Sequence, residues 1–183
     1  SGATYIFKRD ENAWSQQAKL VGDDTTTGDS FGSSVAISGD YAIVGARSDD
    51  NLKGAAYIFK RDGTTWSQLQ KIVASDRGDG DQFGGSVSIS GDYAIVGAVR
   101  NDDVFNDSGS AYIFKRDGTT GAWSQLVKLL AGDPAVSDGF GQKISISGDY
   151  VIVGATNKNG NTGAAYIYNA PNIIPKLTFD NFN

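Results

Sequence analysis

Pairs of aspartates recur three times in the sequence with the same spacing, and carboxylate oxygens are the ligands that calcium prefers in proteins. Each pair fits the pattern Asp-x4-Asp-x-Phe-Gly, in which x is any residue. The pairs are Asp24 and Asp29, Asp76 and Asp81, and Asp133 and Asp138. A fold that gathers these loops at one end could bind calcium there, and any bound metal is expected among these carboxylates. The alternative is that the aspartates form turns and solvated loops, a common use of this residue.

Three tryptophans also occupy equivalent positions, and their rings could bind a ligand. These residues are Trp14, Trp66 and Trp123. Aromatic rings exposed on a rigid rim stack on sugar rings, so the pattern is compatible with a carbohydrate-binding site. The alternative is that an aromatic residue repeated once per unit packs against its neighbours. Asn106 begins the glycosylation motif Asn-Asp-Ser, which has meaning only if the protein is secreted by a eukaryote.

The composition argues against several functional classes. The 183 residues include no Cys and no His, so disulfides, cysteine-based zinc sites and the usual serine or cysteine catalytic triads cannot form. The net charge is −5 and no basic stripe is present, so nucleic acid is not an expected partner. No apolar run approaches the roughly 18 residues of a membrane span, so membrane insertion is not expected. Carboxylate pairs can act as acid and base, but no pair stands out, and we expect no enzyme.

An internal repeat sets the positions of all these residues. The string Ile-Ser-Gly-Asp-Tyr occurs three times, beginning at Ile37, Ile89 and Ile146. Phe-Gly precedes each copy at Phe31, Phe83 and Phe140, and Ile-Val-Gly-Ala follows each copy. The Phe-Gly dipeptides are 52 and then 57 residues apart. Self-similarity on this scale predicts an array of structural units that bury their faces against one another.

One repeat contains the signals of four strands. Residues 34–38 alternate between apolar and small polar types, the period of a strand with two different faces. Gly39-Asp40 predicts a two-residue hairpin turn, because glycine readily adopts a positive φ. Residues 41–44 and 55–59 are apolar strands separated by a polar loop, and after a turn at Asp62-Gly63 residues 66–72 form a more polar strand. Four antiparallel strands per period predict an all-β protein made of β-propeller blades.

Phe-Gly followed by Gly-Ala at this spacing resembles the FG-GAP repeat of integrin α-subunit propellers and of many bacterial surface proteins. The resemblance covers about residues 2–168 and implies an extracellular or cell-surface propeller. The sequence departs from the family in the calcium loop, because the two-residue Gly-Asp turn stands in place of the acidic run. We therefore expect no calcium at Asp40, Asp92 or Asp149. The proline of Gly-Ala-Pro is also replaced, by Arg47, Val99 and Thr156.

The repeats predict about three and a half blades in one propeller domain, residues 1–169. Residues 1–20 match the second half of a repeat, and further repeats start near residues 30, 82 and 139. Residues 170–183 form a non-repeat tail with two prolines and several apolar residues, which we interpret as an inter-subunit strand. Closed propellers need at least four blades, and an open array exposes strand edges and blade faces. We expect completion by another chain or by missing sequence.

These features predict a homo-oligomer. One arrangement is a two-fold dimer that forms a seven-bladed ring, since seven is the blade number of the family that the sequence resembles. The other is a head-to-tail polymer in which the tail of one subunit completes a blade of the next. The expected function is a non-enzymatic extracellular structural or adhesion module that binds surface proteins or itself. The alternatives are a carbohydrate-binding, lectin-like propeller that recognises glycans, and a subunit of a surface filament. Packed tryptophans favour the structural module, and tryptophans on an open rim favour the lectin.

Overall fold

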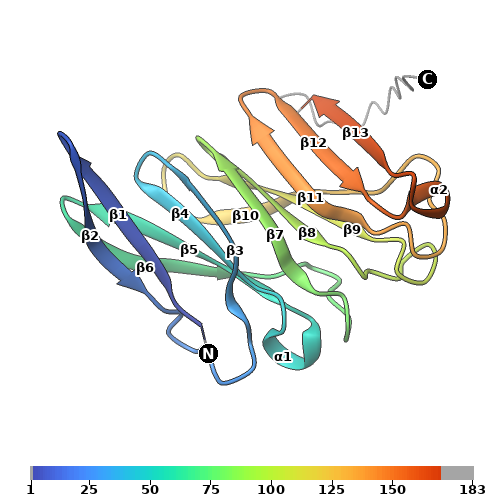
Figure 1. The fold of residues 1–183 in the computed structure, drawn as a ribbon, viewed down its shortest axis with the longest axis horizontal. Helices are drawn as coiled ribbons and strands as arrows, with labels where there is room; N and C mark the ends of the chain where they lie inside the picture. The colour runs from blue at the N-terminus through green and yellow to red at the C-terminus, as the bar shows by residue number, and fades with distance from the viewer. Residues whose placement is uncertain (1, 170–183) are drawn as a thin grey trace.

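The computed structural model describes residues 2–169; residue 1 and the proposed inter-subunit strand within residues 170–183 lie outside the described part. The described residues form thirteen strands in four antiparallel sheets, which lie side by side along the molecule (Figure 1). Each sheet is one blade, or part of one, of an incomplete propeller. The all-β class and the prediction of about three and a half blades are confirmed.

The strand bounds define four units. The half-blade holds β1 (Thr4–Asp10) and β2 (Ala13–Leu20). The first full blade holds β3 (Phe31–Ser38), β4 (Tyr41–Ala46), β5 (Ala55–Asp62) and β6 (Thr65–Ile72). The second full blade holds β7 (Phe83–Ser90), β8 (Tyr93–Ala98), β9 (Ser110–Arg116) and β10 (Trp123–Leu129). The last blade holds β11 (Phe140–Ser147), β12 (Tyr150–Ala155) and β13 (Ala164–Asn169).

The Gly-Asp dipeptides form the predicted hairpin turns between the first two strands of each blade. Gly39, Gly91 and Gly148 have φ values of 57°, 56° and 53°. A Cβ added at any of them would meet nothing within 4 Å, so the requirement for glycine comes from the backbone angle and not from a lack of space. These turns fix the strand register that places each apolar face against the neighbouring blade.

Replacement of Gly39, Gly91 or Gly148 by valine is expected to lower the free energy of unfolding by roughly 1–3 kcal/mol, because a β-branched residue is strained at positive φ. Urea unfolding followed by circular dichroism measures the loss. Thermal melts of the three variants should show a similar decrease, since the turns are equivalent. Three unchanged melting temperatures would show that these turns do not hold the strand register.

Two local predictions need correction. The polar loop after β4 contains a short helical turn, α1 (Asp49–Leu52), and the last blade has the equivalent α2 (Lys158–Asn161). Asp50 and Asn51 inside α1 have positive φ, so this segment is a tight double bend and not a regular helix. The turn between β5 and β6 consists of Gly63-Thr64, one residue later than predicted, because Gly63, with φ of 57°, takes the first turn position.

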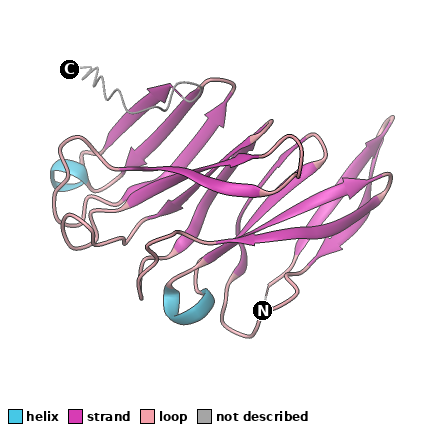
Figure 2. Cartoon of the chain, turned by 180° about the vertical axis from the view of Figure 1, so that it is seen from behind, coloured by secondary structure: helices cyan, strands magenta, loops and turns pink. Residues whose placement is uncertain are grey.

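Figure 2 shows the strands of the blades from behind. The apolar core lies between consecutive blades. Three clusters of buried side chains each combine residues from two neighbouring units. The phenylalanine of each Phe-Gly dipeptide lies at the centre of one cluster. The Phe83 ring meets Tyr112 and Phe114 edge-on, with centroid distances of 5.5 and 6.0 Å. The Phe31 and Phe140 rings make the equivalent pairs of contacts in the other clusters.

Glycines allow the backbones of neighbouring blades to touch. A Cβ added at Gly45 would come within 3.0 Å of the Gly84 carbonyl oxygen, and one added at Gly97 would equally overlap Gly141. Gly84 and Gly141 have φ values of 87° and 88° at the β-bulge that follows the phenylalanine. The glycines of Phe-Gly and Gly-Ala are therefore two halves of one backbone contact between blades.

Candidate functional sites: the loop carboxylates and the open blade faces

The first aspartate of each pair accepts a hydrogen bond from a tyrosine on the third strand of the following blade. Tyr57 Oη donates to Asp24 over 2.8 Å, Tyr112 Oη donates to Asp76 over 2.9 Å, and Tyr166 Oη donates to Asp133 over 2.6 Å. In each case the aspartate lies on the linker that enters the blade carrying the tyrosine. The contact therefore fastens each linker to the next blade.

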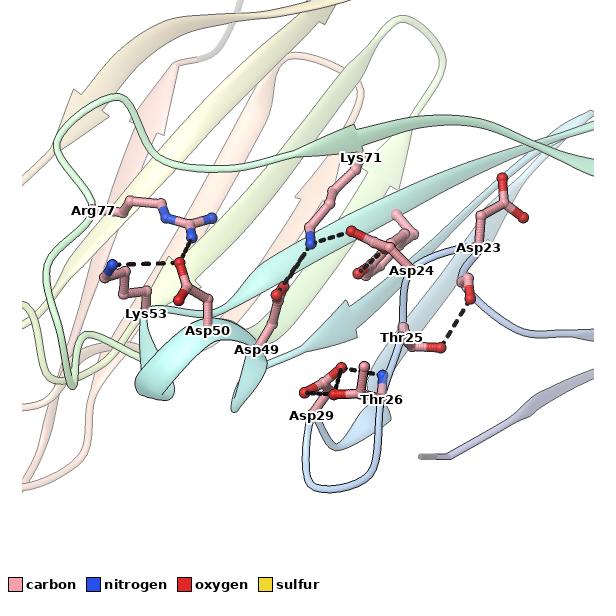
Figure 3. Close-up of polar contacts among 12 residues, drawn as sticks. Asp23, Asp24, Thr25, Thr26, Asp29, Asp49, Asp50, Lys53, Lys71 and Arg77 are labelled. Carbon is pink, nitrogen blue, oxygen red and sulfur yellow. Dashed lines mark hydrogen bonds and ion pairs between the residues drawn. The ribbon is translucent and has the colours of Figure 1, made fainter.

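A lysine ammonium group joins each of these aspartates to a second carboxylate. Lys71 Nζ on β6 lies 2.7 Å from Asp24 and 2.7 Å from Asp49 on α1 (Figure 3). Lys128 on β10 pairs in the same way with Asp76 and Asp103. Figure 3 shows Lys71 between the linker and the α1 turn, where it closes the loop end of the blade.

The last blade has the same network with the charges rearranged. Lys158 on α2 occupies the position that Asp49 has in the first full blade. Its Nζ lies 2.9 Å from Asp138 and 3.4 Å from Asp133. The cation thus comes from the loop in this blade and from the fourth strand in the two full blades.

The second aspartate of each pair closes a tight turn. Asp81 accepts a hydrogen bond from the Gly78 backbone N–H over 2.8 Å, and Asp138 accepts one from the Ala135 N–H over 2.7 Å. Asp29 does the same for Thr26, as Figure 3 shows. Such side-chain-to-backbone bonds mimic a backbone turn. The two aspartates of each pair thus have separate structural roles.

No cluster of three or more acidic or other metal-ligating side chains occurs among residues 2–169. The carboxylates of the three Asp-x4-Asp pairs hydrogen-bond to tyrosines, lysines and backbone N–H groups. A calcium ion bound there would have to displace the lysine ammonium from Asp24, Asp76 or Asp133. Calcium binding at these pairs stays a prediction, as does the absence of calcium at Asp40, Asp92 and Asp149.

The network shifts the pKa values of its members in directions that the contacts explain. The hydrogen bond from Lys71 lowers the pKa of Asp24, and that from Tyr166 lowers the pKa of Asp133. Burial raises the pKa of Asp76, but the hydrogen bonds from Lys128 and Tyr112 outweigh it, and the net shift is downward. Burial raises the pKa of Tyr112 to about 12. All these groups keep their ordinary charge at neutral pH.

The network is expected to make the protein sensitive to acid. A carboxylate with a lowered folded-state pKa stabilises the fold above its unfolded-state pKa, near 3.8 for Asp76, and this contribution is lost as the pH falls through the lowered value. The free energy of unfolding should therefore fall below about pH 4. Lys128→Met should reduce this pH dependence, because it removes the cation that lowers the pKa of Asp76. Urea unfolding at pH 3, 5 and 7 measures the effect.

Lys60→Met is the matched control for this experiment. Lys60 is exposed on β5 and makes no ion pair with any residue in the range 2–169. The control should keep the acid sensitivity of the unchanged protein. Equal acid sensitivity in the Lys128 and Lys60 variants would contradict a role for the network.

The three tryptophans lie in different environments despite their equivalent positions. Trp123 is 3% exposed and meets the Tyr41 ring edge-on at a centroid distance of 6.0 Å. Trp66 is half-buried, and its Nε1–H donates to Gln17 Oε1 over 2.9 Å. Trp14 is 69% exposed. The ring is therefore covered wherever the preceding blade is complete. Asn106, the glycosylation candidate, lies exposed in the loop between β8 and β9.

The two ends of the blade array present apolar faces that no other described residue covers. The outer face of the half-blade, called the Trp14 face, consists of Tyr5, Phe7 and Trp14, which are 48%, 54% and 69% exposed. The outer face of the last blade, called the Tyr150 face, consists of Tyr150, Ile152 and Ile167, which are 63%, 43% and 60% exposed. Exposed apolar patches of this kind are more common at interaction sites than elsewhere on protein surfaces.

The sequence predicts open blade faces but not the residues that form them. Comparing equivalent positions would have found them. Ile43 and Ile58 of the first full blade are fully buried, whereas the equivalent Ile152 and Ile167 of the last blade are exposed. The difference arises because the first full blade has a neighbour on that side among the described residues and the last blade has none.

No helix within residues 2–169 is long and apolar enough to cross a membrane. The family model for the FG-GAP repeat matches residues 14–59, 66–114 and 123–168. Each matched segment runs from the fourth strand of one unit to the third strand of the next, so the sequence repeat spans a junction between blades. The matches contain all three Phe-Gly dipeptides and cover most of the sequence, and the chain therefore belongs to the FG-GAP repeat family.

Proposed function

We propose that this protein is a non-enzymatic extracellular structural or adhesion module that binds other proteins, including copies of itself, through its open blade faces. FG-GAP repeats form propeller modules that often take part in protein interactions, and they are typically extracellular and non-enzymatic. The observation that carries the proposal is the pair of apolar faces that residues 2–169 leave exposed at the two ends of the blade array.

Each open face displays large apolar side chains. Three such residues on the Trp14 face and three on the Tyr150 face are 43% or more exposed. Contiguous apolar surface of this kind is rare on monomeric soluble proteins and typical of interaction sites. The free edge of β1 adds unpaired backbone groups next to the Trp14 face, because β1 pairs only with β2 among the described strands. Association with a partner would remove both the apolar side chains and the unpaired backbone groups of β1 from water.

A lectin-like function receives less support from the tryptophan positions. Trp123 is buried against Tyr41, and Trp66 is half-buried against Gln17, so neither ring is free to stack on a sugar. Trp14 alone of the three is mostly exposed. It lies on a face that resembles the packed blade junctions, which favours a protein partner over a glycan.

Sedimentation velocity of the 183-residue chain tests the proposal. The expected result is an average mass that exceeds the 19.3 kDa of one chain and rises with protein concentration, both with and without calcium. A monomer that stays folded and melts cooperatively at micromolar concentrations would overturn self-association. Further association seen only with calcium would indicate that the loop aspartates contribute.

A further inference from the structure

We propose that two copies of this chain bind head to tail, with the Tyr150 face of one copy on the Trp14 face of the other. Tyr150 of one copy would pack on Arg9 and Trp14 of the next. This inference rests on the self-association in the proposed function and names the surfaces and the contact that produce it.

The junction between the two full blades is the template for this contact. The Tyr41 ring of the first full blade meets Trp123 of the second edge-on, at 6.0 Å between centroids. The guanidinium carbon of Arg116 lies 4.9 Å from the centroid of the same ring. Arg116 and Trp123 are directly opposite each other on β9 and β10. A tyrosine of one blade is thus held by an Arg–Trp pair of the following blade.

The half-blade presents the same Arg–Trp pair without its tyrosine. Arg9 and Trp14 are directly opposite each other on β1 and β2, in the register of Arg116 and Trp123. Both side chains are exposed, and Arg9 makes no ion pair with any residue in the range 2–169. The adjacent Tyr5 and Phe7 match Tyr112 and Phe114, which are buried in the internal junction.

The last blade presents the complementary half of the junction. Its exposed residues stand at the positions that Tyr41, Ile43 and Ile58 occupy in the first full blade, and these are Tyr150, Ile152 and Ile167. In the first full blade both isoleucines are fully buried by the following blade. The half-blade of a second copy offers the Arg9–Trp14 pair, with Tyr5 and Phe7 beside it, to this face. In the internal junction β7 also packs on β4 and β5, and the half-blade has no equivalent of this first strand among the described residues. The contact would therefore cover Ile152 and Ile167 in part.

The two faces differ, so the contact is heterologous. One copy contributes Tyr150 and its partner contributes Arg9 and Trp14, and each copy then still has one free face. A repeated contact of this kind closes into a ring or continues as a filament, depending on the rotation between copies. An aromatic contact buried at the centre of an interface is the kind that carries much of the binding free energy.

Two variants that each block one face test this arrangement. Trp14→Glu places a charge on one face, and Tyr150→Glu places a charge on the other. Both side chains are exposed, so folding should persist, and circular dichroism checks this. Each purified variant should self-associate much more weakly than the unchanged protein. Its apparent dissociation constant should be at least about thirtyfold higher, because a central aromatic anchor of the interface is lost. An equimolar mixture should form a one-to-one dimer that grows no further, because each variant keeps one functional face.

Val136→Glu is the control, because Val136 is 63% exposed in a loop outside both faces. It should associate like the unchanged protein. If the unchanged protein associates and the two face variants associate equally well, the head-to-tail contact is wrong while self-association stands. The same conclusion follows if the equimolar mixture stays monomeric. A monomeric unchanged protein overturns both the contact and the self-association proposed above.

Discussion

Gly97→Ala is expected to lower the free energy of unfolding by about 3 kcal/mol, the upper part of the range for forced overpacking. The added Cβ would lie within 3.0 Å of the Gly141 carbonyl oxygen and of Ser86 Oγ. Gly141 belongs to the backbone of the next blade, and it cannot move away without disturbing the bulge at Phe140. The small gain in strand propensity from glycine to alanine, about 0.5–1 kcal/mol, is too small to offset this overlap.

Gly154→Ala provides a matched control, because Gly154 holds the same position in the last blade. Its added Cβ would come no closer than 3.6 Å to Lys143, which is ordinary contact. We expect no loss, and a gain of up to about 0.5–1 kcal/mol in strand propensity, because no overlap opposes it. Urea unfolding of both variants measures the difference. Equal losses at Gly97 and Gly154 would show that the close approach between blades does not explain these glycines.

Phe83→Ala is expected to cost about 3–5 kcal/mol, as large-to-small changes of buried aromatic residues do. Phe83 is fully buried between the two full blades and meets Tyr112 and Phe114 edge-on. Truncation removes both aromatic contacts and leaves a cavity. The two blades cannot move closer to fill it, because their backbones already touch at Gly45 and Gly84. The variant should also lose cooperativity, since Phe83 lies at the junction that joins the two halves of the molecule.

Phe105→Ala is the control for this prediction, since Phe105 is 46% exposed in the loop between β8 and β9. The same truncation there should change stability by less than about 1 kcal/mol, because little apolar surface returns to water. Calorimetry and urea unfolding give both values. A loss at Phe83 no greater than that at Phe105 would contradict the central role of the Phe-Gly phenylalanine.

The blades and their hairpin turns could be predicted because their signals are local and occur three times. The apolar alternation before Gly39, the Gly-Asp turn and the apolar strand after it determine a hairpin within eleven residues, 34–44. The α1 turn could not be predicted in this way. Asp50 and Asn51 adopt positive φ there. These residue types tolerate that conformation at single positions, so nothing in the local sequence indicates two such residues in succession.

The roles of the aspartates could not be predicted from their spacing. Asp24 and Asp29 look like one carboxylate pair in the sequence, yet the first accepts bonds from Tyr57 and Lys71, and the second closes a turn. Lys71 lies 47 residues after Asp24, so only the folded blade brings them together. A signal did exist in the sequence, because the tyrosine recurs at the same position of the third strand in each repeat.

The residues of the exposed faces follow from the repeat as a whole and not from their local sequence. Ile43 and Ile152 lie in nearly the same local sequence, with Ala42 replaced by Val151, and their burial differs because only the first has a following blade among the described residues. Burial in a repeat array depends on the position of the unit and not on its local sequence.

The equivalent junctions also bear on how a gene of this kind can change length. Each blade meets the next through the same glycine contact and the same phenylalanine. If one whole sequence repeat is duplicated or deleted, the blades on either side of the change again meet through complementary faces. No further substitution is then needed to restore the junction, wherever in the repeat the change begins. The longer period accommodates its five additional residues, 57 against 52, in the loop between β8 and β9 and in the turn between β9 and β10. The end of the longer loop still contacts the next blade at Phe140, as the shorter loop does at Phe83. Recombination between repeats can thus vary the number of blades while each junction stays intact.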